Sequence, residues 1–567
     1  MKDVISNLIV NALKKEGVIL KEEEVEKLIE IPPSQEMGDY AFPCFFLVSK
    51  LKQSPDKIAL NIKGKIENSP NELENIQTKG PYINFFVDRK KIALNLIREI
   101  KSLKDEYGKS ISTGKNTMVE FPSPNTNKPL HLGHLRNMAI GESTSRILEF
   151  NGEKVIRANL NNDRGIHICK SMAAYKFYGR KRTPKIAKKK SDHFVGDFYV
   201  MFNKKEKENV KLEAESRQLL QEWEKGNKEV IELWRKMNKW ALDGFKETYS
   251  KFGIKHDVEF FESDIYKNGR DIIEKGLKDN IFIKKEDGAI VADLEKEGLG
   301  EKVLLRADGT SIYMTQDLYL AKLKYNKYKI DKSIYIVGNE QDYHFKVLFI
   351  ILKKLGFNFD GLKHLSYGMV NLPEGRMKSR EGNVVDADDL IEKVQKLVKK
   401  ELESRDKLSK KQLEERSLKI ALAAIKYILL KVDTKKDMLF NPKESIDFEG
   451  DTGPYILYSY ARASSILKKL KKIDERYSVG ELEEKEIALV KKLSEFKEIV
   501  LKSFRDLNPS TLANYSYQLS QIFNEFYHSC PVLNSEKESF RADLVISFRQ
   551  VLKNALYLLG IEPLEKM

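Results

Sequence analysis

Cysteine is scarce in this sequence. Its three cysteines are Cys44, Cys169 and Cys530. They are odd in number and far apart, which argues against a disulfide framework and against a metal site built on cysteine pairs. Such usage is typical of a reducing compartment. We expect all three thiols to be buried or neutral.

Long apolar stretches are also missing. No run of eighteen apolar residues occurs, so no transmembrane helix is expected. Residues 1–17 include acidic side chains and lack a cleavage pattern, so they do not resemble a secretory signal. By elimination, we expect a cytoplasmic protein with no membrane partner.

Charged and apolar residues are abundant. Hydrophobic residues make up 41% of the chain and charged residues 33%, a balance typical of globular proteins. A chain of 567 residues has room for about three or four domains. The net charge of +15 favours a polyanionic partner, although lysine richness can also reflect genome composition.

The order of apolar patterns predicts several domains. Residues 1–112 mix helix and strand patterns and predict an α+β domain. Strands and helices alternate over 113–405, which predicts a Rossmann-like parallel sheet, interrupted at about 176–300 by a polar, helical inserted subdomain. Residues 406–567 predict an α-helical bundle. Its expected helices lie near 410–431, 453–473, 483–506, 509–527 and 539–559.

A basic run occupies residues 180–190, where seven of eleven side chains are lysine or arginine. Such a run is either a solvated loop or a contact for nucleic acid. The sequence leaves both interpretations open.

The most informative stretch is FPSPNTNKPLHLGHLRN, residues 121–137. An apolar strand pattern precedes it and a helix pattern follows it. It is therefore predicted to be a strand-to-helix turn, where the free N–H groups of a helix start can bind phosphate. Pro129 suits the first helical turn, and Thr126 or Asn127 suits the N-cap.

Two histidines in this stretch share one helical face, because His131 and His134 are three residues apart. Gly133 lets a ring or backbone approach closely, and Lys128 adds a cation. The group predicts a nucleotide site that acts on a triphosphate by electrostatics. The alternatives are zinc, disfavoured because neither an HExxH pattern nor a cysteine pair is present, and two surface histidines without a role.

Six motifs together resemble a known family. His131-Leu-Gly-His134 resembles the HIGH motif of class I aminoacyl-tRNA synthetases, and RMKSREG at 376–382 resembles their KMSKS loop. The arginyl-tRNA synthetase family in particular is resembled by the longer stretch that contains the first motif, SPNTNKPLHLGHLRN, and by DGTSIYMTQDL, GNEQDYHF, DFEGDTGPYILYSYARASSI and LYLLGIEPLEKM. The likeness covers nearly the whole chain.

This resemblance implies a reaction and its partners. Arginine and ATP would give arginyl-adenylate and pyrophosphate, and arginine would then pass to the 2′-hydroxyl of the terminal adenosine of tRNA(Arg). ATP is expected to enter with Mg²⁺, with no zinc and no other metal held by the protein. We expect a monomer.

The resemblance also implies an arginine site. A planar guanidinium with five donors needs fixed acceptors. Asp317 and Tyr313, four residues apart on a predicted helix, would bind the guanidinium. Glu120 and Asn125 would hold the amino and carboxylate ends, with Gln341 assisting.

For ATP, the resemblance places Gly133 against the adenosine and the Met369-Val370 backbone against adenine. The residues implied for catalysis are His131, His134, Lys128, Lys378 and Arg380. The KMSKS-like loop departs from the family pattern, because Ser379 stands where KMSKS has its second lysine. Which cation contacts pyrophosphate therefore stays open.

For tRNA, the C-terminal bundle, 406–567, resembles the family's anticodon-binding domain. Tyr455, Tyr458 and Arg462 share one face of a predicted helix and could stack on unpaired bases. The N-terminal unit, 1–112, resembles the domain that touches the tRNA elbow, which makes Tyr82 and Asn84 candidates there.

Two rival functions come from other classes. One is an HxGH-type nucleotidyltransferase that makes a small cofactor, but such an enzyme needs only the sheet domain. The other is a synthetase-like binding module without catalysis, which the intact histidine pair and the cation-rich loop disfavour.

Overall fold

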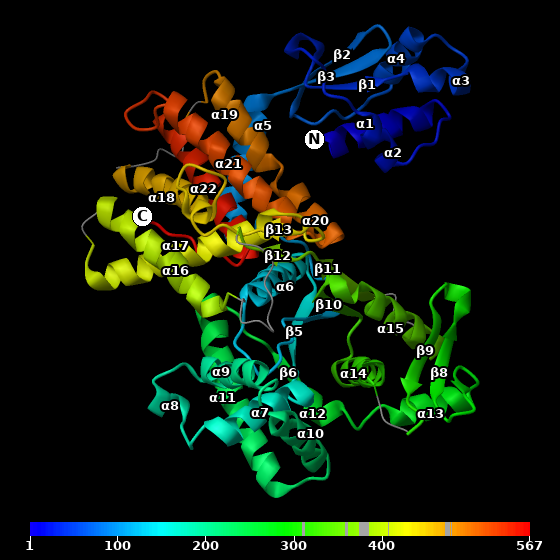
Figure 1. The fold of residues 1–567 in the computed structure, drawn as a ribbon. Helices are drawn as coiled ribbons and strands as arrows, with labels where there is room; N and C mark the ends of the chain where they lie inside the picture. The colour runs from blue at the N-terminus through cyan, green and yellow to red at the C-terminus, as the bar shows by residue number, and fades with distance from the viewer. Residues whose placement is uncertain (309–311, 358–360, 374–384, 406–407, 471–476, 478) are drawn as a thin grey trace. The chain divides into compact units, whose positions relative to one another are not determined.

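The computed structural model describes the chain except for residues 309–311, 358–360, 374–384, 406–407, 471–476 and 478, and except for the side chains of residues 35, 210 and 405. The described residues form two compact units (Figure 1). The first comprises Met1–Lys104, Lys469–Ser494 and Glu525–Phe548. The second comprises Asp105–Lys468, Glu495–Asn524 and Arg549–Met567.

The first unit begins with a small α+β domain, as predicted. A three-stranded antiparallel sheet has the order β1-β3-β2. Its elements are α1 (Lys2–Lys15), α2 (Glu22–Leu28), β1 (Tyr40–Pro43), α3 (Val48–Leu51), α4 (Pro55–Gly64), β2 (Leu73–Lys79) and β3 (Tyr82–Val87). Ile5, Ile9 and Leu13 of α1 are fully buried with Phe85 of β3 in one core. Their spacing is the helical periodicity that predicted α1.

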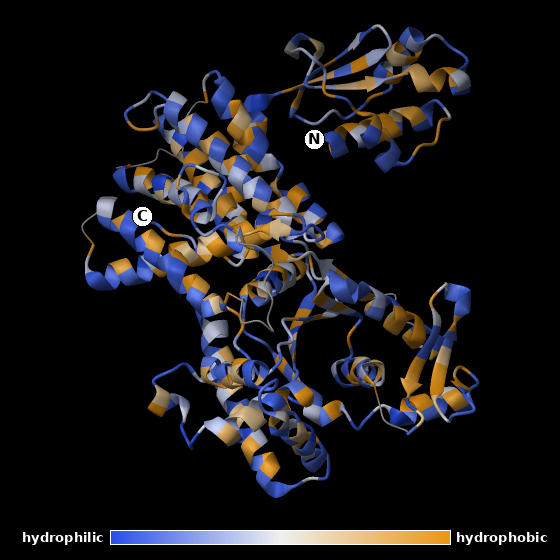
Figure 2. Ribbon diagram, viewed as in Figure 1, coloured by the Kyte–Doolittle hydropathy of each residue, from blue (hydrophilic) through white to orange (hydrophobic). Residues whose placement is uncertain are grey.

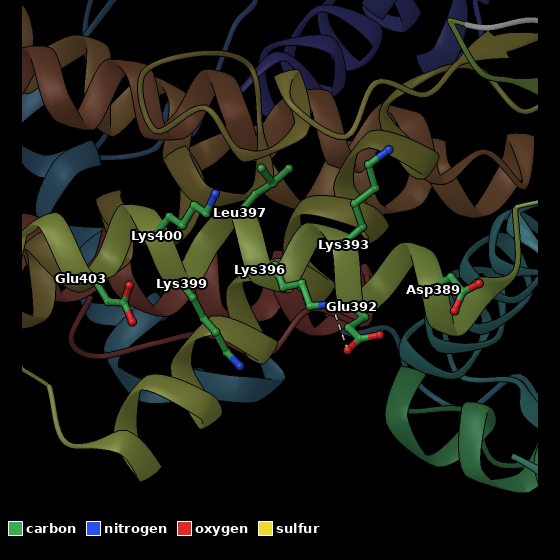
Figure 3. A pocket seen from close by; sticks show the side chains of 8 residues that line it. All are labelled: Asp389, Glu392, Lys393, Lys396, Leu397, Lys399, Lys400 and Glu403. Atoms are coloured by element: carbon green, nitrogen blue, oxygen red, sulfur yellow. Dashed lines mark ion pairs between the residues drawn. The ribbon is translucent and has the colours of Figure 1, made fainter. Parts of the chain in front are cut away.

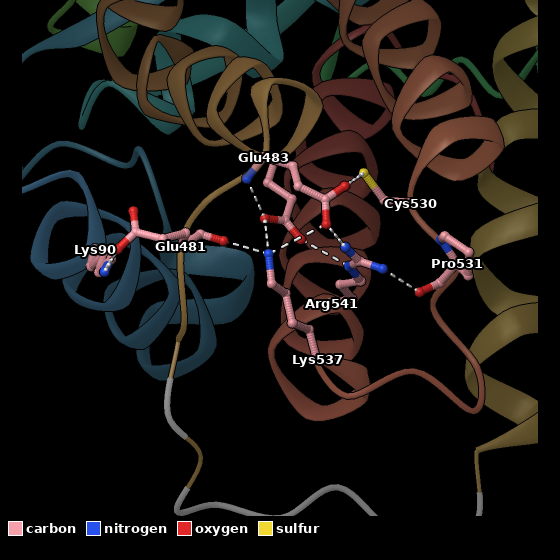
Figure 4. Close-up of polar contacts among 8 residues, drawn as sticks. Lys90, Glu481, Glu483, Cys530, Pro531, Lys537 and Arg541 are labelled. Atoms are coloured by element: carbon pink, nitrogen blue, oxygen red, sulfur yellow. Dashed lines mark hydrogen bonds and ion pairs between the residues drawn. The ribbon is translucent and has the colours of Figure 1, made fainter.

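Helices complete the first unit: α5 (Arg89–Leu103), α19 (Glu484–Ser494) and the adjoining ends of α21 (Pro509–Ser529) and α22 (Glu538–Leu558). Figure 4 shows the polar network that joins them. Arg541 donates from Nε to Glu486 at 2.8 Å and from Nη1 to the Pro531 carbonyl at 2.7 Å, and pairs with Glu483. These paired charges hold the start of α19 against α22.

The three thiols are buried, as predicted. Burial raises the pKa of Cys44 and of Cys169 to about 12. Burial also raises the pKa of Cys530 to about 12, helped by Glu483, whose carboxylate accepts its S–H at 3.3 Å. All three are therefore neutral near pH 7.

The second unit contains the predicted Rossmann-like sheet. Its five strands are β4 (Asn116–Glu120), β5 (Lys154–Asn161), β6 (Val258–Phe261), β10 (Lys332–Gly338) and β11 (Leu362–Tyr367). The order is β11-β10-β4-β5-β6, and every pair is parallel. From β4 the chain continues to β5 and β6 on one side of this strand, and β10 and β11 are added later on its other side. The switch point between β4 and β10 is where ligands bind in such sheets, outside the carboxyl ends of the strands.

The helix after β4 is buried on all sides. α6 (Leu132–Phe150) contacts β4, β5 and β10 and also α16, α17 and α20. Nearly every residue of α6 is therefore buried, including polar ones such as Arg136 and Asn137. α15 (Asp342–Lys354) contacts β11, and α14 (Tyr313–Tyr328) shares a core with β4 through Leu320 and Met118. The helix after β5 is α7 (Ile166–Tyr178).

The prediction of one helical insertion at about 176–300 is partly wrong, because this range also contains strands. The range contains the helices α8 (Pro184–Ala187), α9 (Ser191–Lys205), α10 (Val210–Glu224), α11 (Lys228–Phe252), α12 (Glu262–Ile265) and α13 (Arg270–Lys278). It also contains the sheet strand β6 and an antiparallel sheet of β7 (Ile283–Lys284), β8 (Ile290–Leu294) and β9 (Gly300–Leu305). Figure 2 shows the hydrophobic residues along β8 and β9.

The helix α8 lies within the basic run at residues 180–190. Thr183 caps this helix by accepting the Ile186 N–H, and Arg180, Lys181, Lys185 and Lys188 are exposed. Exposure is compatible with both interpretations of the run.

The rest of the second unit is mostly helical, as predicted. It contains α16 (Ala387–Arg405), α17 (Lys410–Lys431), α18 (Gly453–Lys469), α20 (Phe496–Asp506) and the remaining parts of α21 and α22. The single helix predicted at 483–506 is two helices that separate at Glu495. A parallel pair of short strands, β12 (Val370–Asn371) and β13 (Met438–Leu439), was not predicted. No helix in the described part of the chain is long and apolar enough to cross a membrane.

Candidate active site

The turn after β4 starts its helix differently from the prediction. The N-cap of α6 is His131, and its Nδ1 accepts the Gly133 N–H at 3.1 Å. In return, Nδ1 of His134 accepts the His131 N–H at 3.1 Å. The two histidines thus form a capping box, which satisfies two backbone donors of the first helical turn.

Thr126 and Asn127 do not cap the helix because they bond elsewhere. Thr126 donates its hydroxyl to Asn238 of α11, and Asn127 donates to the His167 carbonyl at 3.4 Å. Both are buried. These contacts hold the early part of the turn against α7 and α11, so the helix starts later than Pro129.

The capping box sets the chemical form of both imidazoles. Burial, with the Lys128 charge adding, lowers the pKa of His131 to about 3 and that of His134 well below its usual value. Both rings are therefore neutral near pH 7. A neutral ring that accepts at Nδ1 carries its proton on Nε2, so each ring offers one N–H donor. The ring centroids lie 3.8 Å apart.

Gly133 makes this arrangement possible. A Cβ at this position would lie 3.0 Å from Cε1 of His131, closer than side chains normally pack. The glycine therefore leaves room for the His131 ring, as the sequence predicted for a close approach.

Lys128 and His131 line a cavity of about 130 Å³ with His193, Tyr199 and Asp386. Burial lowers the pKa of the Lys128 ammonium. Lys378 and Arg380 lie outside the described residues. The chain just beyond them meets the turn, because the Leu132 N–H donates to the Val385 carbonyl at 3.1 Å. The turn therefore contacts Val385, three residues after the end of the KMSKS-like motif in the sequence.

Arg136, one turn further along α6, is fully buried and bonded only to backbone carbonyls among its described hydrogen-bond partners. Its acceptors are the carbonyls of Gly368 at 2.6 Å, Met369 at 3.3 Å, Asp433 at 3.4 Å, Thr434 at 3.3 Å and Lys436 at 2.9 Å. One guanidinium thus joins α6 to the end of β11 and to the turn before β13.

Replacing Arg136 by methionine should lower the free energy of unfolding by about 3 kcal/mol or more, because several buried carbonyls lose their donor. Urea unfolding followed by circular dichroism would measure this. Arg136→Lys should recover only part of the loss, since one ammonium cannot reach all five acceptors. A loss below about 1 kcal/mol for the methionine variant would contradict the assigned role.

The same region defines the backbone expected to meet adenine. Both backbone groups of Met369 already have hydrogen-bond partners. Its N–H donates to Asp437 Oδ1 at 2.7 Å, and its carbonyl accepts the Met438 N–H at 2.9 Å. In a parallel pair of strands, a residue hydrogen-bonds to the two residues that flank its partner and not to the partner itself. Since Met438 pairs with Val370, the Val370 N–H and carbonyl point away from β13.

The expected guanidinium ligands lie on α14. Tyr313 is its first residue and 73% exposed, and Asp317 follows one turn later on the same face. His344 of α15 holds Asp317, with 2.7 Å between Nε2 and Oδ2. Asp317 is therefore an oriented carboxylate beside the carboxyl end of β10.

The residues expected at the amino-acid backbone lie at the same sheet edge. Glu120 ends β4, is buried, and pairs with the fully buried Lys324 of α14 at 2.5 Å. Asn125 is exposed and its backbone bridges to Asn162, while Gln341 is exposed just before α15. The fold thus brings residues from three distant segments to the switch point.

Sequence reasoning missed Glu262, the residue directly after β6. Burial raises the pKa of Glu262 to about 7, Arg164 at 3.8 Å opposes this, and Asp163 and Asp317 add to it. A carboxylate directly after a sheet strand is a recognisable signal. It was missed because VEFF was assigned to the helical insertion.

Two groups of described residues have the chemistry of metal ligands. In one, Asp192 and Asp388 flank His193, but Lys190 Nζ lies 3.0 Å from Asp192 Oδ2 and 2.8 Å from Asp388 Oδ2. In the other, the α19–α22 network above, Arg541 and Lys537 already hold the carboxylates. Both groups are explained as ion pairs.

A hollow on α16 also carries charge (Figure 3). Its lining is Asp389, Glu392, Lys393, Lys396, Leu397, Lys399, Lys400 and Glu403. Four lysines and three acids nearly cancel. The hollow is a solvated helix face and contains no residue expected for catalysis.

The aromatic face predicted in the C-terminal bundle is present on α18. Tyr455 and Arg462 both bond Asn524 of α21, at 2.9 and 2.5 Å. Tyr458 is 37% exposed, and the Arg462 guanidinium lies 4.8 Å from its ring centroid. This face therefore presents a tyrosine ring backed by a cation.

Known proteins resemble every part of the chain. The family described as tRNA synthetases class I (R), catalytic domain, matches residues 96–442. The Arginyl tRNA synthetase N terminal domain matches 3–87, and the DALR anticodon binding domain matches 456–567. A relative named Arginine–tRNA ligase, from Treponema denticola, is 48% identical over 565 residues, 95% of this chain and 94% of its own. The chain belongs to the arginyl-tRNA synthetase family.

Other members of the arginyl-tRNA synthetase family agree. The Arginine–tRNA ligase of Borrelia hermsii is 43% identical over 100% of this chain and 99% of its own. The solved structure of the Thermus thermophilus arginyl-tRNA synthetase superposes with a TM-score of 0.83 at 26% identity, covering 100% of both chains. The predicted fold class and family are therefore confirmed.

Within this synthetase fold, Tyr82 and Asn84 lie on β3, in the part matched by the N-terminal family domain. Tyr82 is half-buried and packs edge-on against Phe45, with 5.4 Å between ring centroids. Asn84 is 5% exposed. The side chain of Asn84 is thus less exposed than that of Tyr82.

Proposed function

We propose that this enzyme ligates arginine to tRNA(Arg) in protein synthesis, in two ATP-dependent steps. The observation that carries this is the match over 95% of the chain to an arginine–tRNA ligase. We further propose three domains: an elbow-binding domain at 1–112, a catalytic domain at 113–405 with an insertion at about 176–300 that the sheet strand β6 interrupts, and an anticodon-binding domain at 406–567. It would act as a cytoplasmic monomer.

In the first step the arginine carboxylate attacks the α-phosphorus of ATP, and the bond to pyrophosphate breaks. Negative charge then spreads over the phosphate oxygens, and positioned donors stabilise it. His131 and His134 supply Nε2–H donors and Lys128 supplies a cation. Because these rings offer N–H groups rather than free lone pairs, they suit phosphate better than zinc.

The leaving pyrophosphate needs further cations. Lys378 and Arg380 are proposed for it, from their place in the KMSKS-like motif. ATP would carry Mg²⁺ on its own phosphates, which supplies additional charge neutralisation there. Gly133 would lie against the adenosine, and Val370, whose backbone groups point away from β13, would meet adenine.

Arginine would bind across the switch point between β4 and β10. Asp317 and Tyr313 would hold the guanidinium, with Glu262 as an added carboxylate beside Asp317. Glu120 and Asn125 would hold the amino and carboxylate ends, and Gln341 would assist. Because both termini of the ligand are fixed, its carboxylate can be placed beside the α-phosphate.

The experiment that tests this function is arginine-dependent exchange of pyrophosphate into ATP, with and without tRNA(Arg). We expect exchange with arginine when tRNA is present and little without it, as in the family that the sequence resembles. An HxGH nucleotidyltransferase would exchange with another acceptor, and a binding module would show no exchange. Absence of arginine-dependent exchange in both conditions would overturn the proposal.

Tyr458→Ala should weaken tRNA charging. Loss of a stacking ring costs about 1–3 kcal/mol per base, so the KM for tRNA should rise by about tenfold while the KM for arginine stays unchanged. Tyr557→Ala, which removes an exposed tyrosine of α22, is the control and should leave both constants unchanged. Equal effects of the two variants would argue against an anticodon contact. Tyr455, Arg462, Tyr82 and Asn84 are the other proposed tRNA contacts.

A further inference from the structure

Lys324 is a fully buried lysine beside the proposed arginine site. It lies seven residues after Asp317 on α14, two helical turns along the same side. Its Nζ is 2.5 Å from Glu120 Oε2 and 4.3 Å from the ring centroid of Tyr335. Tyr335 is the direct neighbour of Glu120 across the β4–β10 pair.

Such burial needs an explanation. An ammonium group is costly to remove from water unless a charge pairs with it, and a buried ion pair can often be replaced by apolar residues without loss of stability. A pair kept at a ligand site therefore points to a role in that site. The other titratable groups that face this pair are Asp317, on the same helix, and the Tyr335 phenol, which burial keeps neutral by raising its pKa.

A count of charges suggests the role. Arginine carries a guanidinium, an ammonium and a carboxylate, so its net charge is +1. Glu120 and Asp317 contribute two negative charges, and Lys324 returns one positive charge. Glu262 adds no net charge to this count, because Arg164 pairs with it at 3.8 Å. The proposed site then has a net charge of −1, opposite to that of its ligand. Without Lys324 the site would carry one negative charge in excess, at a buried position.

We propose that Lys324 is a positioning residue for arginine activation, which holds the Glu120 carboxylate in its orientation and matches the charge of the site to that of arginine. This role rests on the proposed contact between Glu120 and the α-ammonium of arginine. Lys324 touches neither substrate; it acts through Glu120.

The first test is Lys324→Met, which keeps the length and apolar stem of the side chain. In pyrophosphate exchange the KM for arginine should rise by about 30-fold, which corresponds to a loss of about 2 kcal/mol, while the KM for ATP changes less than twofold. Lys324→Arg, which keeps the charge, should restore most of the activity.

The second test reverses the sign of the effect. Glu120→Gln alone leaves the site with no net charge, because Asp317 and Lys324 cancel. Adding Lys324→Met to Glu120→Gln returns the net charge to −1 and should lower the arginine KM at least fivefold relative to Glu120→Gln. A purely structural lysine would give no such improvement. The double variant also lacks any unpaired buried charge, so it should fold even where Lys324→Met does not.

The outcomes separate two failures. If Glu120→Gln leaves the arginine KM unchanged, the proposed arginine contact of Glu120 is wrong. If Glu120→Gln raises the KM but Lys324→Met added to it brings no improvement, the role of Lys324 is overturned. An unchanged arginine KM in Lys324→Met alone would overturn it as well.

Discussion

Replacing Asp317 by alanine should lower arginine-dependent pyrophosphate exchange by roughly 10³-fold or more. A site built to bind a charged donor group rejects ligands strongly when its acceptor is missing, because the remaining polar groups are left unpaired. Asp317 is the proposed acceptor for the guanidinium. Most of the effect should appear in kcat/KM for arginine, measured by exchange in the presence of tRNA.

ATP binding separates this effect from misfolding. Binding of ATP to the Asp317→Ala variant, measured by calorimetry, should match that of the parent, because the phosphate-binding turn at residues 121–137 lies on a different segment. His344→Gln is the companion variant, since it removes the imidazole from Asp317 and leaves the carboxylate in place. Its loss should be much smaller. An unchanged arginine KM in Asp317→Ala would show that the guanidinium binds elsewhere.

Local patterns predicted most of the elements around this site. The run 116–120 is β4 as expected, and the buried run at 333–337 is the middle of β10. Apolar spacing predicted α5, α17, α18 and α22 closely, because each of these helices buries one face. The parallel sheet followed from the alternation of strands and helices.

Other features depend on contacts that local patterns do not record. β6 is only four residues long and pairs with β5 across about a hundred residues of chain, so its pattern resembled that of an insertion. The N-cap of α6 depends on what else Thr126 can bond. Its hydroxyl bonds a residue of α11, 112 positions away, and His131 therefore caps the helix.

Charge partners were the least predictable part. Nothing local to Glu120 indicates that a lysine of α14 neutralises it, and nothing local to Asp317 indicates His344. Glu262 is similar, because its raised pKa comes from burial and from the carboxylates of two other segments. Motifs thus identify the residues that meet substrate, while the residues that set their charge become visible only in three dimensions.

The amino-acid end and the nucleotide end of the site use charge differently. At the arginine end, paired carboxylates hold fixed negative charge for a cationic ligand. At the phosphate end, two neutral imidazoles offer oriented N–H dipoles beside one lysine. Neutral donors do not attract extra counter-ions before the reaction, yet they stabilise charge as it develops on the phosphate oxygens.

This contrast leads to the second large effect. His134→Gln should lower kcat of pyrophosphate exchange by about 10²-fold or more, the usual cost of losing one donor to a developing oxyanion. Glutamine at this position can still accept the His131 N–H, as in an ordinary capping box, so the helix start is kept. His131→Asn is the partner variant, because asparagine is a good N-cap without an imidazole. Both should unfold at nearly the parent temperature, and the KM for arginine should change little.

The pH dependence tests whether the rings act as neutral donors. Because the folded pKa of His131 is about 3, the ring is uncharged throughout the range from pH 6 to 9, and exchange should show no histidine titration there. Stability should behave differently: below about pH 6.5 the unfolded chain takes up a proton that the folded His131 refuses, so falling pH destabilises the parent. His131→Asn should lose less stability over this range. A kcat that depends on a group titrating near pH 6.5, and that loses this dependence in His131→Asn, would mean that the imidazolium rather than the imidazole acts on the phosphate.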